Sequence, residues 1–125
     1  MAFETGDTTI ARDETRDLIS SEKVDGTVVY NRQGEKLGTV TSFMVGKRTG
    51  RVQYAVLSFG GLFGMGEKFY PLPWDALTYD TDKGGYVVDL DKERLEGAPS
   101  NERGGEPDYD RTYGERVDGY YGVAY

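Results

Sequence analysis

The sequence has 125 residues, with 22 acidic and 15 basic side chains and a formal net charge of −7. It contains no cysteine and no histidine, which excludes disulfides, thiolate catalysis and Cys-based zinc sites and removes the commonest general base. The length suits one small domain with tails, and the acidity gives no electrostatic support to nucleic-acid binding.

The charge divides the chain into three segments. Residues 1–17 carry five acids and two bases, residues 18–98 eleven and ten, and residues 99–125 six and three. We expect a flexible segment at 1–17, a nearly neutral domain at 18–99 and an acidic, tyrosine-rich tail at 100–125. No apolar run approaches the ~20 residues that span a bilayer, and the polar N-terminus does not resemble a signal peptide. The sequence therefore predicts a cytoplasmic location without a transmembrane segment, and leaves peripheral membrane association open.

Turn residues recur at short intervals between apolar runs, which is typical of an all-β barrel or sandwich. One helical turn is expected at 17–23, with Ser20 or Ser21 as its cap. Gly38 interrupts the second strand and predicts a bulge or sharp bend there. The predicted strands cover residues 27–30, 36–45, 51–59, 67–72, 78–80 and 85–90.

Two further short helical turns are predicted between and after the last strands. Residues 73–77 begin with a proline, which is tolerated in a first helical turn. Residues 91–95 form the other, capped by Asp91 and ended at Gly97.

The strand at 51–59, RVQYAVLSF, has apolar side chains on both faces. Tyr54 and Val56 point to one side, and Leu57 and Phe59 to the other. Because both faces need cover, we expect the sheet to curl into a small barrel on one side. A helix, a tail or a partner chain must cover the other side.

The next segment, GGLFGMGEK, is rich in glycine but does not have the spacing of a phosphate-binding loop. Glu67 follows its last glycine where Lys should stand, and Phe69 follows Lys68 where Ser or Thr should stand. The large apolar residues Leu62, Phe63 and Met65 are costly to expose together, so we expect them to cover the barrel or to contact a partner.

The remaining groups of charged and aromatic side chains give weaker predictions of function. The acidic residues near the last strands lack the order of a calcium loop, so neither a metal nor a cofactor is expected. Lys47, Arg48 and Arg51 form a small basic cluster, which is either a solvated hairpin tip or a weak nucleic-acid contact.

Five of the ten tyrosines lie at or after Tyr109. That tail is either flexible or docked on its own domain or on a partner, and docking is slightly favoured because tyrosine gives large contact area at low entropy cost.

The chain resembles the stand-alone PRC-barrel domain proteins, a family named for the cytoplasmic domain of the photosynthetic reaction-centre H subunit. The matching pieces are GTVVYN at 26–31 with GEKLG at 34–38, TGRVQYAVLS at 49–58, GG at 60–61 with GMGEK at 64–68, and PLPWDAL at 71–77. The resemblance covers about residues 18–99. It implies a small closed β-barrel and no catalytic residues. It also implies an interaction module, as in reaction centres and in a ribosome-maturation factor.

The resulting hypothesis is a non-enzymatic interaction or scaffolding module that forms a homodimer. The alternatives are an RNA- or ribosome-associated factor, a reaction-centre-associated protein and a small-ligand binder. The residues expected at a partner interface are Leu62, Phe63, Met65, Phe69, Trp74, Tyr113, Tyr120 and Tyr121. The nucleic-acid alternative rests on Lys47, Arg48 and Arg51 alone.

Overall fold

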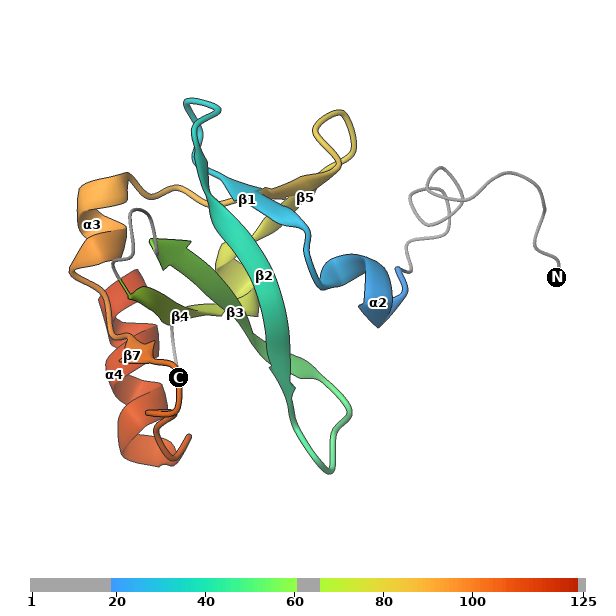
Figure 1. The fold of residues 1–125 in the computed structure, drawn as a ribbon. Helices are drawn as coiled ribbons and strands as arrows, with labels where there is room; N and C mark the ends of the chain where they lie inside the picture. The colour runs from blue at the N-terminus through green and yellow to red at the C-terminus, as the bar shows by residue number, and fades with distance from the viewer. Residues whose placement is uncertain (1–18, 61–65, 124–125) are drawn as a thin grey trace, which may run out of the picture.

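A computed structural model describes residues 19–60 and 66–123 (Figure 1). Its elements in chain order are α2 (Ser21–Val24), β1 (Val28–Tyr30), β2 (Lys36–Val45), β3 (Val52–Gly60), β4 (Glu67–Pro73), the 3₁₀ turn η2 (Trp74–Ala76), β5 (Thr78–Asp80), β6 (Gly85–Val87), α3 (Lys92–Glu96), β7 (Asn101–Glu102) and α4 (Arg111–Tyr121). Every predicted strand is present, with bounds shifted by one residue at most except in β6, which ends earlier than predicted. The segment at 1–17 and the interface residues Leu62, Phe63 and Met65 lie outside the described residues.

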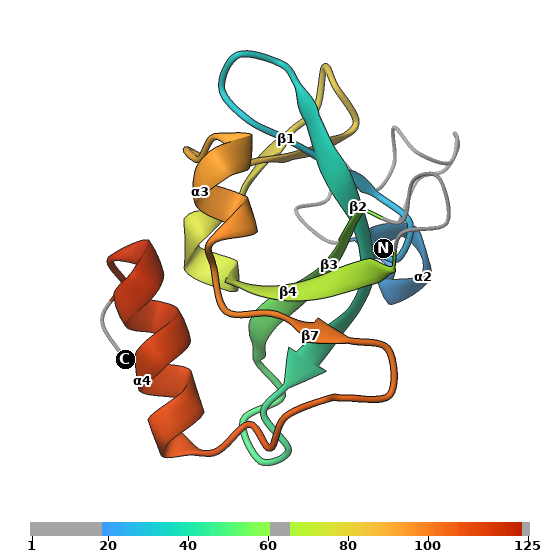
Figure 2. The ribbon, with the colours of Figure 1, turned by 60° about the vertical axis from the view of Figure 1, so that its left-hand side comes forward.

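The described strands form a seven-stranded sheet in the order β5-β6-β1-β2-β3-β4-β7. Only β1 and β6 are parallel; the other neighbours are antiparallel. The strands wrap around a common interior (Figure 2), but no hydrogen-bonded ladder joins the two edge strands, β5 and β7. The predicted closed barrel is therefore not confirmed among the described strands. The edge strands have only three and two residues, which leaves little backbone to close a ladder.

The interior is filled from the inward faces of the long strands. Leu37 and Val40 of β2, Leu57 of β3 and Leu72 of β4 are all buried, and Leu95 of α3 closes one end. Because the sheet is strongly curved, β2 and β3 must approach each other closely, and a glycine on β2 leaves room for this.

That close approach is at Gly38. A Cβ atom there would lie 2.2 Å from the carbonyl oxygen of Ser58. The β1–β2 register also shifts next to it, since Val29 is paired with Gly38 but Tyr30 with Lys36. The irregularity predicted at this glycine is confirmed, and it bends β2 across the barrel.

Local capping signals set the short helices. Ser20 caps α2 by accepting a hydrogen bond from the amide of Glu22. Asp91 caps α3 by accepting from the amide of Arg94 at 2.8 Å, and Gly97 ends it. Asp91 and Gly97 are the predicted ends of α3. Ser20 is one of the two predicted caps of α2, but this helix spans 21–24 and not the predicted 17–23.

The sequence left the C-terminal tail as either flexible or docked, and residues 101–102 and 111–121 form regular structure in place of a flexible tail. Asp110 accepts a hydrogen bond from the Tyr113 amide at 2.9 Å and starts α4. Gly122, with φ of 73°, ends it in the left-handed conformation. Val117, in the middle of α4, is completely buried. The acidic composition of this segment did not indicate the amphipathic helix α4, whose large apolar side chains are mostly tyrosines.

Candidate functional site

The C-terminal arm, which we define as residues 99–123, packs against β4 and α3 and reaches Tyr54 on the outer face of β3. Tyr54 is 8% exposed. Its ring lies 5.8 Å from that of Tyr109, and its hydroxyl donates a hydrogen bond to Asp118 on α4. The chain itself thus covers this part of the two-faced strand, while Val56 and Ser58 on the same face stay partly exposed.

The arm is attached to the barrel by polar contacts at both ends. At its start, β7 pairs with Lys68 and Phe69 of β4. Nearby, Arg103 forms an ion pair with Glu67 at 2.6 Å, and Ser58 donates a short hydrogen bond to the same carboxylate. Hydrogen bonds from Ser58 and Arg103 lower the pKa of Glu67.

At the other end, the Tyr120 hydroxyl donates to the backbone oxygen of Arg94 at 2.6 Å. In return, the Arg94 guanidinium donates to the backbone oxygen of Tyr120 at 2.6 Å and lies 4.7 Å from its ring centre. The hydroxyls of Tyr113 and Tyr121 are buried without a hydrogen-bond partner among the described residues. The structure therefore places two of the three predicted interface tyrosines of α4, Tyr120 and Tyr121, against their own barrel. Tyr113 packs edge-on against Tyr109 within the arm, with ring centres 5.2 Å apart.

Burial of side chains of the arm shifts their pKa values. It raises the pKa of Tyr109 to about 12 and also raises the pKa of Tyr121. Burial also raises the pKa of Asp118. The hydrogen bond from Tyr54 acts in the opposite direction, and the negative charge of nearby Asp75 adds to the rise. We therefore expect docking of the arm to depend on pH.

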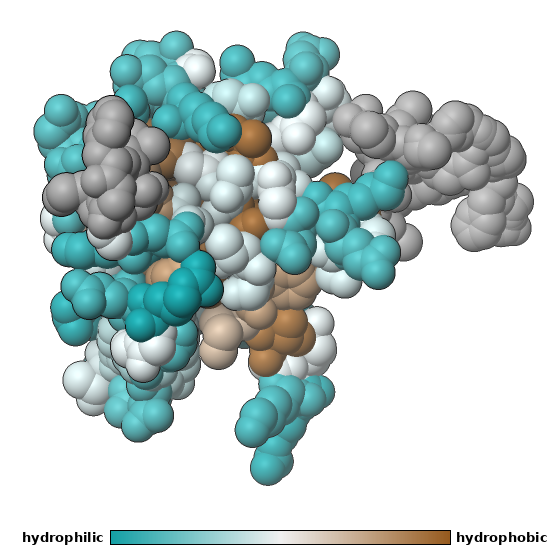
Figure 3. Space-filling view, in the orientation of Figure 1, coloured by the Kyte–Doolittle hydropathy of each residue, from teal (hydrophilic) through white to brown (hydrophobic). Residues whose placement is uncertain are grey.

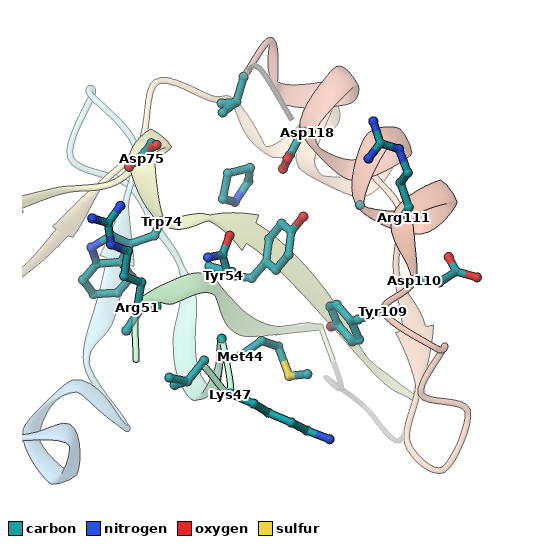
Figure 4. A pocket seen from close by; sticks show the side chains of 17 residues that line it. Met44, Lys47, Arg51, Tyr54, Trp74, Asp75, Tyr109, Asp110, Arg111 and Asp118 are labelled. Atoms are coloured by element: carbon teal, nitrogen blue, oxygen red, sulfur yellow. The ribbon is translucent and has the colours of Figure 1, made fainter. Parts of the chain in front are cut away.

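A cleft of about 800 Å³ lies between the β2–β3 hairpin and the arm (Figure 4). Met44, Lys47 and Arg51 line its hairpin side. Asp110, Arg111 and Asp118 line its arm side, and Figure 4 shows Tyr54 between the two sides. The hairpin wall is thus basic and apolar, whereas the arm wall carries charges of both signs.

The hairpin carries the exposed apolar surface of the described chain. Met44 is 36% exposed and Val45 44%, and no other large hydrophobic residue in the described ranges is classed as exposed. In Figure 3 brown side chains gather next to the teal hairpin tip. The tip itself carries Lys47, Arg48 and Arg51, all exposed and without an ion pair to any described residue.

Sequence reasoning missed Met44 and Val45. They stand at the end of β2, next to the basic loop, and the sequence predicts only that they belong to this strand. Two large apolar residues in succession, Met44 and Val45, just before a polar hairpin loop were the available signal, because neighbouring strand residues point to opposite faces and cannot both point into the core.

The two remaining predicted interface residues lie apart. Phe69 is 9% exposed and is covered by the Arg103 guanidinium, 5.0 Å from its ring centre. Trp74 lines the cleft and packs edge-on against Tyr86 with ring centres 5.5 Å apart. Of the predicted residues, Trp74, Lys47 and Arg51 come together at one cleft.

Within the described ranges, no three or more acidic side chains gather closely enough to hold a metal ion. None of the described helices has both the length and the apolar character needed to cross a membrane.

Comparison with known proteins gives one curated relative and one solved structure of interest. The chain is 31% identical over 70 residues to an uncharacterised protein of Deinococcus radiodurans, a match that covers 56% of this chain and 24% of that protein. It spans about a quarter of that relative. A solved structure described as a 16S ribosomal RNA processing protein, RimM, from Pseudomonas aeruginosa is similar with a TM-score of 0.38 and 16% identity. That match covers 60% of this chain and 45% of the other, and so weak a likeness carries no argument about function.

The family comparison is decisive. The family model of the PRC-barrel domain matches residues 16–95, which include α2, every described strand except β7, and all but the last residue of α3. The C-terminal arm lies outside the match. The chain therefore belongs to the PRC-barrel domain family.

Proposed function

We propose that this chain is a non-catalytic interaction module that binds other polypeptides and forms a homodimer. The observation that carries the proposal is the exposure of Met44 and Val45 beside the cleft. Exposed apolar side chains grouped on one face and rimmed by charge are typical of protein-binding surfaces.

The cleft supports binding better than catalysis. Its acidic residue with a raised pKa, Asp118, accepts a hydrogen bond from Tyr54, so it is held as part of the arm's attachment. A general acid or base must lie within hydrogen-bond reach of the proton that it transfers, whereas the Asp118 carboxylate is already engaged by Tyr54. The mixture of aromatic, apolar and charged side chains that line the cleft suits a peptide or protein segment.

Light scattering coupled to size-exclusion chromatography tests the proposal. We expect a mass about twice the 13.9 kDa of one chain, falling toward that of the monomer on dilution. A mass of one chain at every concentration would overturn the homodimer. The cytoplasmic location stays a prediction, which cell fractionation can check.

A second candidate, RNA binding, is supported only by the exposed basic tip of the hairpin. Lys47, Arg48 and Arg51 project together from an otherwise acidic chain. RNA binding with a steep salt dependence, lost in Arg48→Ala and Arg51→Ala, would favour it. No retention of RNA at low salt would remove it. Association with a reaction centre and small-ligand binding have no separate support.

A further inference from the structure

The residues that the structure describes leave one stretch of strand edge in this sheet unpaired. The ten-residue β2 is paired with β3 along most of its length, but β1 reaches only its first part, Lys36 to Thr39. The backbone of Val40 is also hydrogen-bonded on that side. Its carbonyl oxygen accepts from the Gly26 amide at 2.6 Å, and its amide donates to the Thr27 carbonyl oxygen at 2.9 Å. From Thr41 to Val45, no described backbone group pairs with this edge of β2.

The other edges are protected in ways that this one is not. The outermost strands β5 and β7 are only three and two residues long. Past β7, the edge of β4 contains Pro71 and Pro73, which have no amide to donate. Short strands and prolines are the usual protection against edge-to-edge pairing, as are charged side chains. Residues 41–45, TSFMV, contain neither proline nor charge, and they include both exposed large hydrophobics, Met44 and Val45.

We propose that this free edge of β2 pairs with the same edge of a second copy, antiparallel and about a two-fold axis at Phe43. The inference rests on the proposed self-association and names its surface. A two-fold interface brings the same patch of both copies together. Centring on Phe43 uses the whole free edge, because Thr41 then faces Val45 of the second copy and Ser42 faces its Met44. The two sheets become continuous, and Met44 and Val45 are covered.

Charge at the two ends of the free edge favours this orientation. The basic tip, with Lys47, Arg48 and Arg51, follows directly after Val45. The other end lies beside α2, where Glu22 and Asp25 are exposed and outnumber the single Lys23. Antiparallel pairing places the basic tip of each copy next to the acidic end of the other. Parallel pairing would place tip against tip, which like-charge repulsion disfavours.

A charge placed on the edge tests the pairing. In Met44→Glu, two added carboxylates come close to the pairing axis, so we expect the dimer dissociation constant to rise about tenfold or more. Gln53→Glu is the matched control, because Gln53 is exposed on β3 and lines the same cleft but lies off the free edge. Its dissociation constant should stay within about twofold of wild type. Circular dichroism melts must show that both variants are folded for the comparison to count.

A charge exchange tests the orientation. Arg48→Glu and Asp25→Arg should each weaken the dimer, and the two together should recover most of the loss. No recovery would overturn the antiparallel arrangement. A wild-type dimer that is indifferent to Met44→Glu would overturn the β2 edge as the interface while leaving the homodimer intact. A monomeric wild type would instead overturn the self-association on which the inference rests.

Discussion

Arg94 and Tyr120 hold each other reciprocally across the junction of α3 and α4. The tyrosine hydroxyl donates to the Arg94 backbone oxygen, and the Arg94 guanidinium donates to the Tyr120 backbone oxygen, both at 2.6 Å. Each residue satisfies a helix-terminal carbonyl of the other's helix, which would otherwise need water. This pair fixes the end of the arm to the part of the chain that matches the PRC-barrel family.

Removing the Tyr120 hydroxyl should therefore destabilise the protein. We expect Tyr120→Phe to lower the free energy of unfolding by about 0.5–1 kcal/mol, the usual net value of a partly exposed hydrogen bond. The matched control is Tyr113→Phe, which deletes a buried hydroxyl that has no partner among the described residues. That variant should be neutral or slightly stabilised. Urea denaturation of both measures the difference, and equal losses would contradict the assignment.

Asp118 should make stability depend on pH in a defined direction. Burial raises its pKa in the folded state, so it binds a proton more tightly when folded than when unfolded. Its favourable contribution is complete below the unfolded pKa of about 4 and is lost as pH rises through the raised value. In Asp118→Asn the acceptor for Tyr54 is retained without the charge. We expect this variant to be more stable than wild type at pH 7, with the advantage shrinking toward pH 4.

Denaturation midpoints measured at several pH values between 4 and 7 check this. A difference between Asp118→Asn and wild type that does not vary with pH would show that the carboxyl is not responsible.

Alkaline pH should release the arm. The pKa of Tyr109 is raised to about 12 by burial, so its contribution is complete below the usual tyrosine value of about 10 and is lost as pH rises through about 12. Tyrosinate absorbance and circular dichroism, followed together, should show ionisation and loss of α4 in the same pH range. Tyr109→Phe should move this transition to higher pH. An unchanged transition would mean that other tyrosines control it.

Two glycines give opposite expectations for the same substitution. Gly38→Ala places a Cβ 2.2 Å from the backbone oxygen of Ser58, so β2 and β3 must separate. We expect a loss of more than about 2 kcal/mol in the free energy of unfolding. Gly119→Ala on α4 meets nothing within 4 Å and should gain about 0.5–1 kcal/mol from helix propensity. Thermal unfolding of both variants tests the pair, and a tolerated alanine at 38 would contradict the close approach.

The sequence by itself determined the local structure and the family. Alternating apolar residues, turn glycines and the caps Ser20 and Asp91 act over a few positions, so the strands and short helices could be located from them. The constellation of motifs from Gly26 to Leu77 identified the PRC-barrel resemblance. The two-faced strand at 51–59 also required a second cover, although it did not say which segment supplies it.

Only the tertiary structure decided the rest, because it depends on which distant residues meet. The sequence left open whether the acidic, tyrosine-rich tail is flexible or docked, because the surfaces against which α4 packs, on β4 and α3, are distant in the chain. The open edge of β2 depends on where β1 stops pairing, a register that no local pattern encodes. The exposure of Met44 and Val45 follows from that register, and with it the surface on which the proposed function rests.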